Sequence, residues 1–269
     1  MEFPIEFGKV WALTKRDIYN WSTYKSQMIT TVASSVIGIS AYGVNADWRN
    51  ISVPQYGCDY VSFLIVGILV TNLVLPLGSG VQKQLNPWTL ETILMTGIKT
   101  PTFVLGTSLW TYILSVVLFL PQLYLGVYAF GARLTVNPLS LVIAIIISSL
   151  IIFCLAMIST GIRIVTKVTD PVTWGLAVAA SLLSGLTFPV SQLNNYLPGL
   201  STVSWLLPQT WIYHIVRLST LEAGSLLDPQ IAEAFLVTLG YAAVLVPVSV
   251  VVYRWGLSRA KKDGTLGWY

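Results

Sequence analysis

The chain has 269 residues, a net charge of +4 and 10% charged residues, against about 25% charged residues in typical soluble domains. Four stretches contain no Asp, Glu, Lys or Arg, and they are residues 100–132, 134–162, 171–216 and 234–253. Each stretch reaches or exceeds the ~20 residues that cross a bilayer core. These features exclude an ordinary soluble domain and predict an all-α, multi-spanning membrane protein. The basic residues form no tract, so nothing indicates nucleic-acid binding.

Hydropathy and charge predict six membrane spans, and the first is unusually rich in Ser and Thr. In chain order, the expected spans are Met28–Val44, Tyr60–Leu77, Pro101–Tyr128, Pro138–Ile162, Pro171–Val190 and Ala234–Tyr253. We therefore expect a single transmembrane domain over residues 1–269. It consists of an N-terminal interfacial helix within 1–27, a six-span bundle over 28–253 and a cytoplasmic tail over 254–269.

The distribution of basic residues predicts the orientation of these spans. An even number of spans places both termini on the same side of the membrane. The loops on the opposite side hold only Arg49, Arg133 and Arg217, so 12 of the 15 Lys and Arg residues lie on the side of the termini. Because cytoplasmic loops are enriched in Lys and Arg, we expect a multi-pass protein of the cell membrane with both termini in the cytoplasm.

Residues 7–21 have the periodicity of an amphipathic helix. Its expected apolar face consists of Phe7, Val10, Trp11, Ile18 and Trp21. Lys9, Lys15 and Arg16 supply its positive charge. A helix with tryptophans on one face and basic residues elsewhere suits the headgroup plane of a bilayer. Two interpretations remain open, since the helix either only anchors the N-terminus or also forms part of a cytoplasmic docking surface.

The loop between the second and third expected spans predicts a short, doubly capped helix over 87–96. Asn86 is a good N-cap, Pro87 suits the first helical position and Gly97 is a natural C-terminal stop. The apolar residues of this segment are Trp88, Leu90, Ile93 and Leu94, and Glu91 is its only charge. A loop that only connects two spans does not need a rigid, doubly capped helix, so the pattern favours a functional role. The alternative interpretation is a simple interfacial connector.

The uncharged run 171–216 is too long for one span and too short for two spans with their loops. Pro189, Pro198 and Pro208 interrupt it. We therefore expect the fifth span to end near Pro189, and the segment Leu197–Leu218 to dip back into the outer leaflet as one or two short helices. Such a segment must pack against other spans or a second copy of the chain.

Arg217 is the one charge in this otherwise apolar external segment. An unpaired charge inside a membrane is costly, so Arg217 is expected to reach interfacial water or to pair with an acid. Glu222 is the nearest acid in sequence.

Several kinds of chemistry have no sequence signal in this chain. The expected spans have no acidic residue in their interior, which ion-coupled carriers usually need. No phosphate-binding loop and no Ser-His-Asp arrangement occurs, and the lone His214 is best interpreted as an interfacial side chain. Two Cys and one His form no standard metal-site spacing. We therefore expect no catalytic residue, cofactor or metal in this chain, and a motor that belongs to another protein.

Two groups of residues resemble the ABC-2 type transporter permeases. The C-terminal group is Ser184-Gly185-Leu186-Thr187-Phe188-Pro189-Val190, Leu197-Pro198, Leu207-Pro208 and Arg217. The cytoplasmic group is Trp88-Thr89-Leu90-Glu91-Thr92-Ile93-Leu94, followed by Gly97 and Ile98. The six-span plan with an amphipathic N-terminal helix extends the resemblance over the whole chain.

The resemblance implies the membrane subunit of an ATP-driven exporter. Two copies, or this chain and a paralogue, would pair around a path for a drug, a lipid or a lipid-linked glycan. Two separately encoded ATP-binding subunits would carry ATP and Mg. The coupling interface would comprise Asn86, Pro87, Trp88, Leu90, Glu91, Leu94 and Gly97. The N-terminal interface would comprise Phe7, Trp11, Lys15 and Arg16. The competing class is a membrane-embedded enzyme or assembly factor without transport activity.

Overall fold

In this computed structural model, the described residues are 6–43, 51–83, 97–98, 100–166, 182–195 and 197–262, together with residues 175 and 178. The described chain is all-α, as predicted, apart from one small hairpin. Its helices of eight or more residues are α1 (Phe7–Thr23), α2 (Lys25–Gly43), α3 (Tyr60–Lys83), α5 (Thr100–Tyr124), α6 (Pro138–Thr166), α9 (Pro208–Leu221) and α10 (Pro229–Lys262). The shorter turns are η2 (Pro54–Tyr56), the π segment η3 (Leu125–Ala129), η4 (Val190–Asn195) and α8 (Leu200–Trp205).

The hairpin was not anticipated from the sequence. Strands β1 (Ser52–Val53) and β2 (Cys58–Asp59) pair antiparallel at the end of the bundle where α3 begins. Gly57 closes the turn at φ +57°, a left-handed conformation that residues with a Cβ rarely adopt. Such short strands leave almost no alternating pattern to detect.

Three of the described helices are long and apolar enough to cross a membrane. They are Thr102–Ala129, Pro138–Thr166 and Pro229–Ala260. Helix α3 begins with a shorter apolar stretch, Tyr60–Val74, and α2 has 19 residues but carries many hydroxyl side chains. The expected fifth span lies largely outside the described residues.

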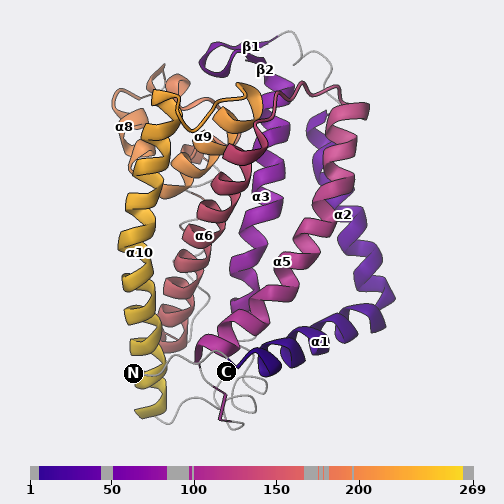
Figure 1. Ribbon diagram of the computed structural model, residues 1–269, viewed down its shortest axis with the longest axis vertical. Helices are drawn as coiled ribbons and strands as arrows, with labels where there is room; N and C mark the ends of the chain where they lie inside the picture. The colour runs from indigo at the N-terminus through magenta and orange to yellow at the C-terminus, as the bar shows by residue number, and fades with distance from the viewer. Residues whose placement is uncertain are drawn as a thin grey trace.

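The long helices run alongside one another, and α3 lies among α2, α5, α6 and α9 (Figure 1). The main core forms where α3, α6, α9 and α10 meet, and it includes Phe63, Ile151, Ile215 and Ala234. Helices α6 and α10 pack most closely, because Gly256 and Gly161 face each other. A Cβ on Gly256 would lie 2.3 Å from the Gly161 carbonyl oxygen. Small residues permit this backbone approach in membrane helix pairs.

Helix α1 crosses the lower end of the bundle and packs against α5 (Figure 1). Thr14 is fully buried, and its hydroxyl donates to the Val10 carbonyl at 3.0 Å. Leu13 fills the space above Gly106 of α5, where a Cβ would meet it at 2.7 Å. The second half of α1 reaches the same neighbour through an edge-to-face contact between Trp21 and Trp110.

The described ends of the chain lie at the same end of the bundle. Leu13 of α1 joins a cluster with Phe103, Tyr253 and Leu257, which brings the start of α5 and the end of α10 together. Helices α8 and α9 and the β-hairpin lie at the opposite end (Figure 1). We call these two opposite ends of the bundle the α1 end and the α9 end.

Candidate functional site

A cavity of about 660 Å³ opens between α2, α3 and α5. We call it the polar cavity, because hydroxyl and amide side chains from all three helices line it. The hydroxyl groups belong to Thr31, Ser34, Ser35, Thr71, Thr111 and Ser115, and the amides to Asn72 and Gln122. None of the described residues that line it is Asp, Glu, Lys or Arg.

Most hydroxyls of the polar cavity donate to carbonyls of their own helix. The Thr31 hydroxyl donates to Gln27 at 2.7 Å, and the Ser115 hydroxyl donates to Thr111 at 2.8 Å. A hydroxyl oxygen that donates in this way still has lone pairs that accept hydrogen bonds. The cavity wall therefore offers acceptors to a guest without leaving unsatisfied donors in a helix bundle.

The two amides connect α3 to α5 at the cavity wall. The Asn72 Nδ2 donates to the Gln122 Oε1 across 3.0 Å. Gln122 is 1% exposed and Asn72 is half-buried, so this bond is partly buried at the cavity wall. A carboxamide has two donor hydrogens and an acceptor oxygen, so this pair retains capacity to bind a polar guest.

Arg217 of α9 forms a second notable site. It is only 2% exposed, and its guanidinium donates to the carbonyls of Gly185 at 2.5 Å, Leu186 at 2.8 Å and Phe63 at 3.3 Å. The guanidinium carbon also lies 3.5 Å from the centre of the Phe63 ring, a cation–π contact. We call this arrangement the Arg217 cage.

The cage corrects the expectation that Arg217 reaches water or pairs with Glu222. Glu222 is exposed, and no ion pair to Arg217 occurs among the described residues. Backbone carbonyls satisfy most of the charge instead, although its Nε has no hydrogen-bond partner among those residues. Gly67 of α3 makes room for it, since a Cβ there would lie 2.7 Å from an Arg217 nitrogen.

Aromatic side chains surround this cage. The Tyr56 hydroxyl and the His214 Nδ1 share a hydrogen bond of 2.8 Å. Burial raises the pKa of Tyr56 to about 12. Burial, together with the charge of Arg217, lowers the pKa of His214 to about 4. Both side chains are therefore neutral at pH 7, and His214 packs against Trp205 and Trp211.

The prolines that interrupt the long uncharged run occupy different environments. Pro189 is buried before η4, Pro198 is exposed, and Pro208 begins α9 at a position where its missing N–H costs nothing. The expected segment Leu197–Leu218, predicted as one or two short helices, contains two, α8 and α9. Helix α9 is buried along most of its length, so it packs into the bundle rather than lying on it.

The other predicted site residues fall into two groups. The residues Asn86, Pro87, Trp88, Leu90, Glu91 and Leu94 lie outside the described part of the chain. Gly97 has φ +68°, a left-handed conformation that glycine adopts readily, and the helix it was expected to end lies outside the described residues. On α1, Phe7 and Trp11 are 79% and 60% exposed.

The predicted single apolar face of α1 is therefore split in two. Val10 turns toward α5, whereas Phe7 and Trp11 face outward, because the face that packs on α5 passes through Val10 and Thr14. Lys15 is exposed and Arg16 is bound by the neighbouring Asp17 carboxylate at 2.7 Å. Lys15 therefore presents the less compensated charge of the two.

Sequence reasoning missed the polar cavity. The signal was present, because Asn72 and Gln122 are amides within otherwise apolar segments. No family model matches the chain, and a search of curated proteins finds no similar sequence. The described residues contain no group of three His, Cys, Asp or Glu side chains placed to hold a metal ion.

Proposed function

We propose that the chain is the membrane-spanning permease subunit of an ATP-driven ABC-2 type exporter. Its cargo is a hydrophobic or amphipathic molecule, such as a drug, a lipid or a lipid-linked glycan. The observation that carries the proposal is the polar cavity of about 660 Å³ among apolar helices. Polar side chains at membrane depth are costly and mark pathways through membrane proteins.

The proposed topology has six spans, formed by α2, α3, α5, α6, residues 171–190 and α10, with both termini in the cytoplasm. The described charges support this orientation. Lys9 and Lys15 lie on α1, and Arg163 and Arg259 lie near the C-terminal ends of α6 and α10. Asp59 lies on β2, Glu222 directly follows α9, Asp228 directly precedes α10, and Glu233 lies near the start of α10. Helices α8 and α9 are then the external re-entrant segment, and α1 lies in the cytoplasmic headgroup plane.

The proposed partners follow from this arrangement. Two ATP-binding subunits dock on the cytoplasmic end, where the 87–96 segment acts as the coupling helix and Lys15 of α1 adds a charged contact. Hydrolysis of ATP then takes place in those subunits, with Mg bound there. A second permease, either another copy or a paralogue, completes the transporter in the cell membrane.

The class is tested by purifying the tagged chain from its native membranes with mild detergent. We expect an ATP-binding cassette subunit, identified by peptide mass spectrometry and its phosphate-binding loop, to co-purify stoichiometrically. Glu91→Arg is expected to reduce this association at least fivefold, with Asp228→Arg in the external loop as the control. If the wild-type chain and the Asp228→Arg control both purify as dimers without an ATP-binding subunit, the proposal is contradicted.

The orientation is tested separately by cysteine labelling in intact cells. Leu227 is 91% exposed in the loop before α10, and Lys262 is exposed at the other end of that helix. A membrane-impermeant thiol reagent is expected to label Leu227→Cys and not Lys262→Cys. The reverse labelling pattern would invert the topology and remove the proposed docking surface.

A further inference from the structure

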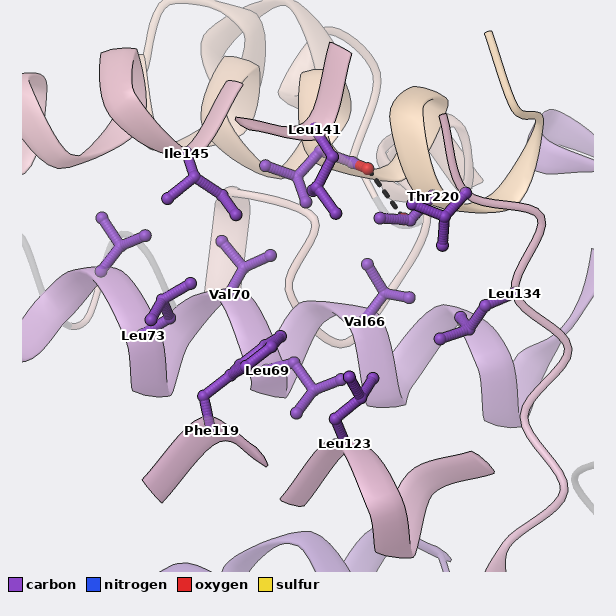
Figure 2. Close-up of a pocket in the computed structure, with 13 residues that line it drawn as sticks. Val66, Leu69, Val70, Leu73, Phe119, Leu123, Leu134, Leu141, Ile145 and Thr220 are labelled. Carbon is purple, nitrogen blue, oxygen red and sulfur yellow. Dashed lines mark hydrogen bonds between the residues drawn. The ribbon is translucent and has the colours of Figure 1, made fainter. Parts of the chain in front are cut away.

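A second cavity, of about 190 Å³, lies on the other side of the α3–α5 contact (Figure 2). We call it the apolar crevice. Helix α3 forms its floor, α5 and α6 form its walls, and the segment before α6 closes one end. The side chains that carry the argument are Val70, Phe119, Leu123, Leu134, Leu141 and Ile145.

The apolar crevice exposes no polar surface. Thr220 is its only lining residue with a hydroxyl, and that hydroxyl donates to the Val216 carbonyl at 2.8 Å, the bond drawn in Figure 2. Water needs several polar partners to occupy a cavity, and apolar cavities of roughly 150 Å³ stay dry and take apolar guests. An empty crevice also loses dispersion contacts along its walls. Its chemistry therefore selects a hydrocarbon.

The crevice reaches the surface of the bundle on an apolar side. Val136 lines it and is 41% exposed. Exposed apolar residues adjoin lining residues in sequence, since Leu120 of α5 is 62% exposed and Val142 and Ile146 of α6 are 54% and 61% exposed. In a bilayer this face meets lipid chains, so a guest enters sideways from the membrane.

A cationic residue adjoins the lining of the crevice in sequence. Arg133 directly precedes the lining residue Leu134, its side chain is exposed, and it forms no ion pair with any described residue. The surrounding backbone is held firmly. The Arg133 amide donates to the Ser62 hydroxyl at 2.8 Å, and the Thr135 amide donates to the Thr220 carbonyl at 3.0 Å.

We infer that the apolar crevice is a binding site for a phospholipid, with one acyl chain between α5 and α6 and the phosphate on Arg133. Charge complementarity identifies the headgroup, because a guanidinium binds phosphate through paired hydrogen bonds. The apolar lining identifies the chain. The inference does not rest on transport, since a bound lipid is expected whatever the cargo of the polar cavity.

Native mass spectrometry of the delipidated full chain tests the chain-binding part. Dioleoyl-phosphatidylglycerol is added in detergent, and the lipid-bound fraction is measured. Ile145→Trp fills the crevice and is expected to lower apparent affinity about tenfold. Its matched control, Ile146→Trp, places the same side chain on the adjacent lipid-facing position and is expected to bind as wild type. Equal binding by both variants overturns the inference.

The headgroup is tested with two probes that share the same acyl chains. Arg133→Gln is expected to weaken phosphatidylglycerol binding at least fivefold and to leave dioleoylglycerol, which lacks a phosphate, unchanged. Lys262→Gln, an exposed cation at the opposite end of the bundle, is the control. If wild type binds dioleoylglycerol as tightly as phosphatidylglycerol, the assignment of the phosphate to Arg133 is wrong.

Photo-crosslinking of the wild-type chain tests the inference without relying on the folding of any variant. A phospholipid with a diazirine in one acyl chain is photolysed with the protein in bilayers, and adducts are mapped by peptide sequencing. Adducts are expected to concentrate on Phe119, Leu123 and Leu141. Even labelling of all lipid-facing helices overturns the inference. It is also overturned if Ile145→Trp abolishes dimerisation, because a second copy of the chain then covers the crevice.

Discussion

The two cavities flank the same pair of helices, but only one of them exposes polar side-chain atoms. On the α2 side, α3 presents Thr71 and Asn72, whereas on the α6 side it presents Leu69, Val70 and Leu73. Helix α5 divides in the same way between Gln122 and Leu123. One helix pair thus separates a cavity with a mixed polar and apolar lining from one whose exposed lining is wholly apolar. The identity of the neighbouring helix, Ser-rich α2 or Ile-rich α6, accounts for the difference.

The largest expected effect comes from placing an amide on the wrong side of α3. Leu73→Asn buries a carboxamide among the apolar side chains of the apolar crevice and is expected to cost about 3 kcal/mol of unfolding free energy. Ile68→Asn places the same amide beside the polar cavity and is expected to cost less than about 1 kcal/mol. Unfolding in mixed detergent and SDS micelles measures both. Equal losses would mean that the two sides of α3 are equivalent.

The next largest effect concerns the Arg217 cage, which connects the two regions. Leu186 lines the polar cavity, and Val216, next to Arg217, lines the apolar crevice. Arg217→Gln leaves buried carbonyls unsatisfied and is expected to destabilise the chain by about 2 kcal/mol.

Gly67→Ala tests the same cage sterically, because its Cβ would meet Arg217 at 2.7 Å. We expect a comparable loss in thermal stability. Gly38→Ala is the control, since nothing lies within 4 Å of a Cβ there. Wild-type stability in Gly67→Ala would show that the cage is loose.

A smaller effect on stability is expected from a change in pH. Neither cavity contributes to it, because their described linings hold no Asp, Glu, Lys, Arg or His. His214 has a pKa lowered to about 4, against about 6.5 when unfolded. The unfolded chain therefore binds a proton first as the pH falls. Stability is full above pH 6.5 and declines toward pH 4. His214→Phe is expected to flatten the melting-temperature profile between pH 6.5 and pH 4. An unchanged slope would show that another group causes the pH dependence.

The smallest effect on stability is expected for the amide bridge of the polar cavity. A double-mutant cycle with Asn72→Leu and Gln122→Leu is expected to give a coupling of about 1 kcal/mol. Under the proposed exporter function, the same changes are expected to lower cargo-stimulated ATPase activity of the proposed complex more than they lower stability. A coupling of zero would show that the bond does not form in the membrane.

The sequence predicted the helices better than it predicted their contacts. The charge gaps located α5, α6 and α10 to within a few residues at most ends, because hydrophobic length is a local property. The extension of α10 from Pro229 to Lys262 was missed, since polar residues at its ends continue the helix beyond the apolar stretch. The position of Arg217 was also missed, because its partners, Gly185 and Phe63, are distant in sequence.

The central claim is that one side of the α3–α5 pair is accessible to water and the other is not. Ser35 lines the polar cavity and Ile145 lines the apolar crevice, and both side chains are half-buried. In a chain with Cys58 and Cys154 replaced by Ser and Ala, a water-soluble thiol reagent applied to membranes is expected to modify Ser35→Cys at least tenfold faster than Ile145→Cys. Equal rates, or faster modification of Ile145→Cys, would contradict the account.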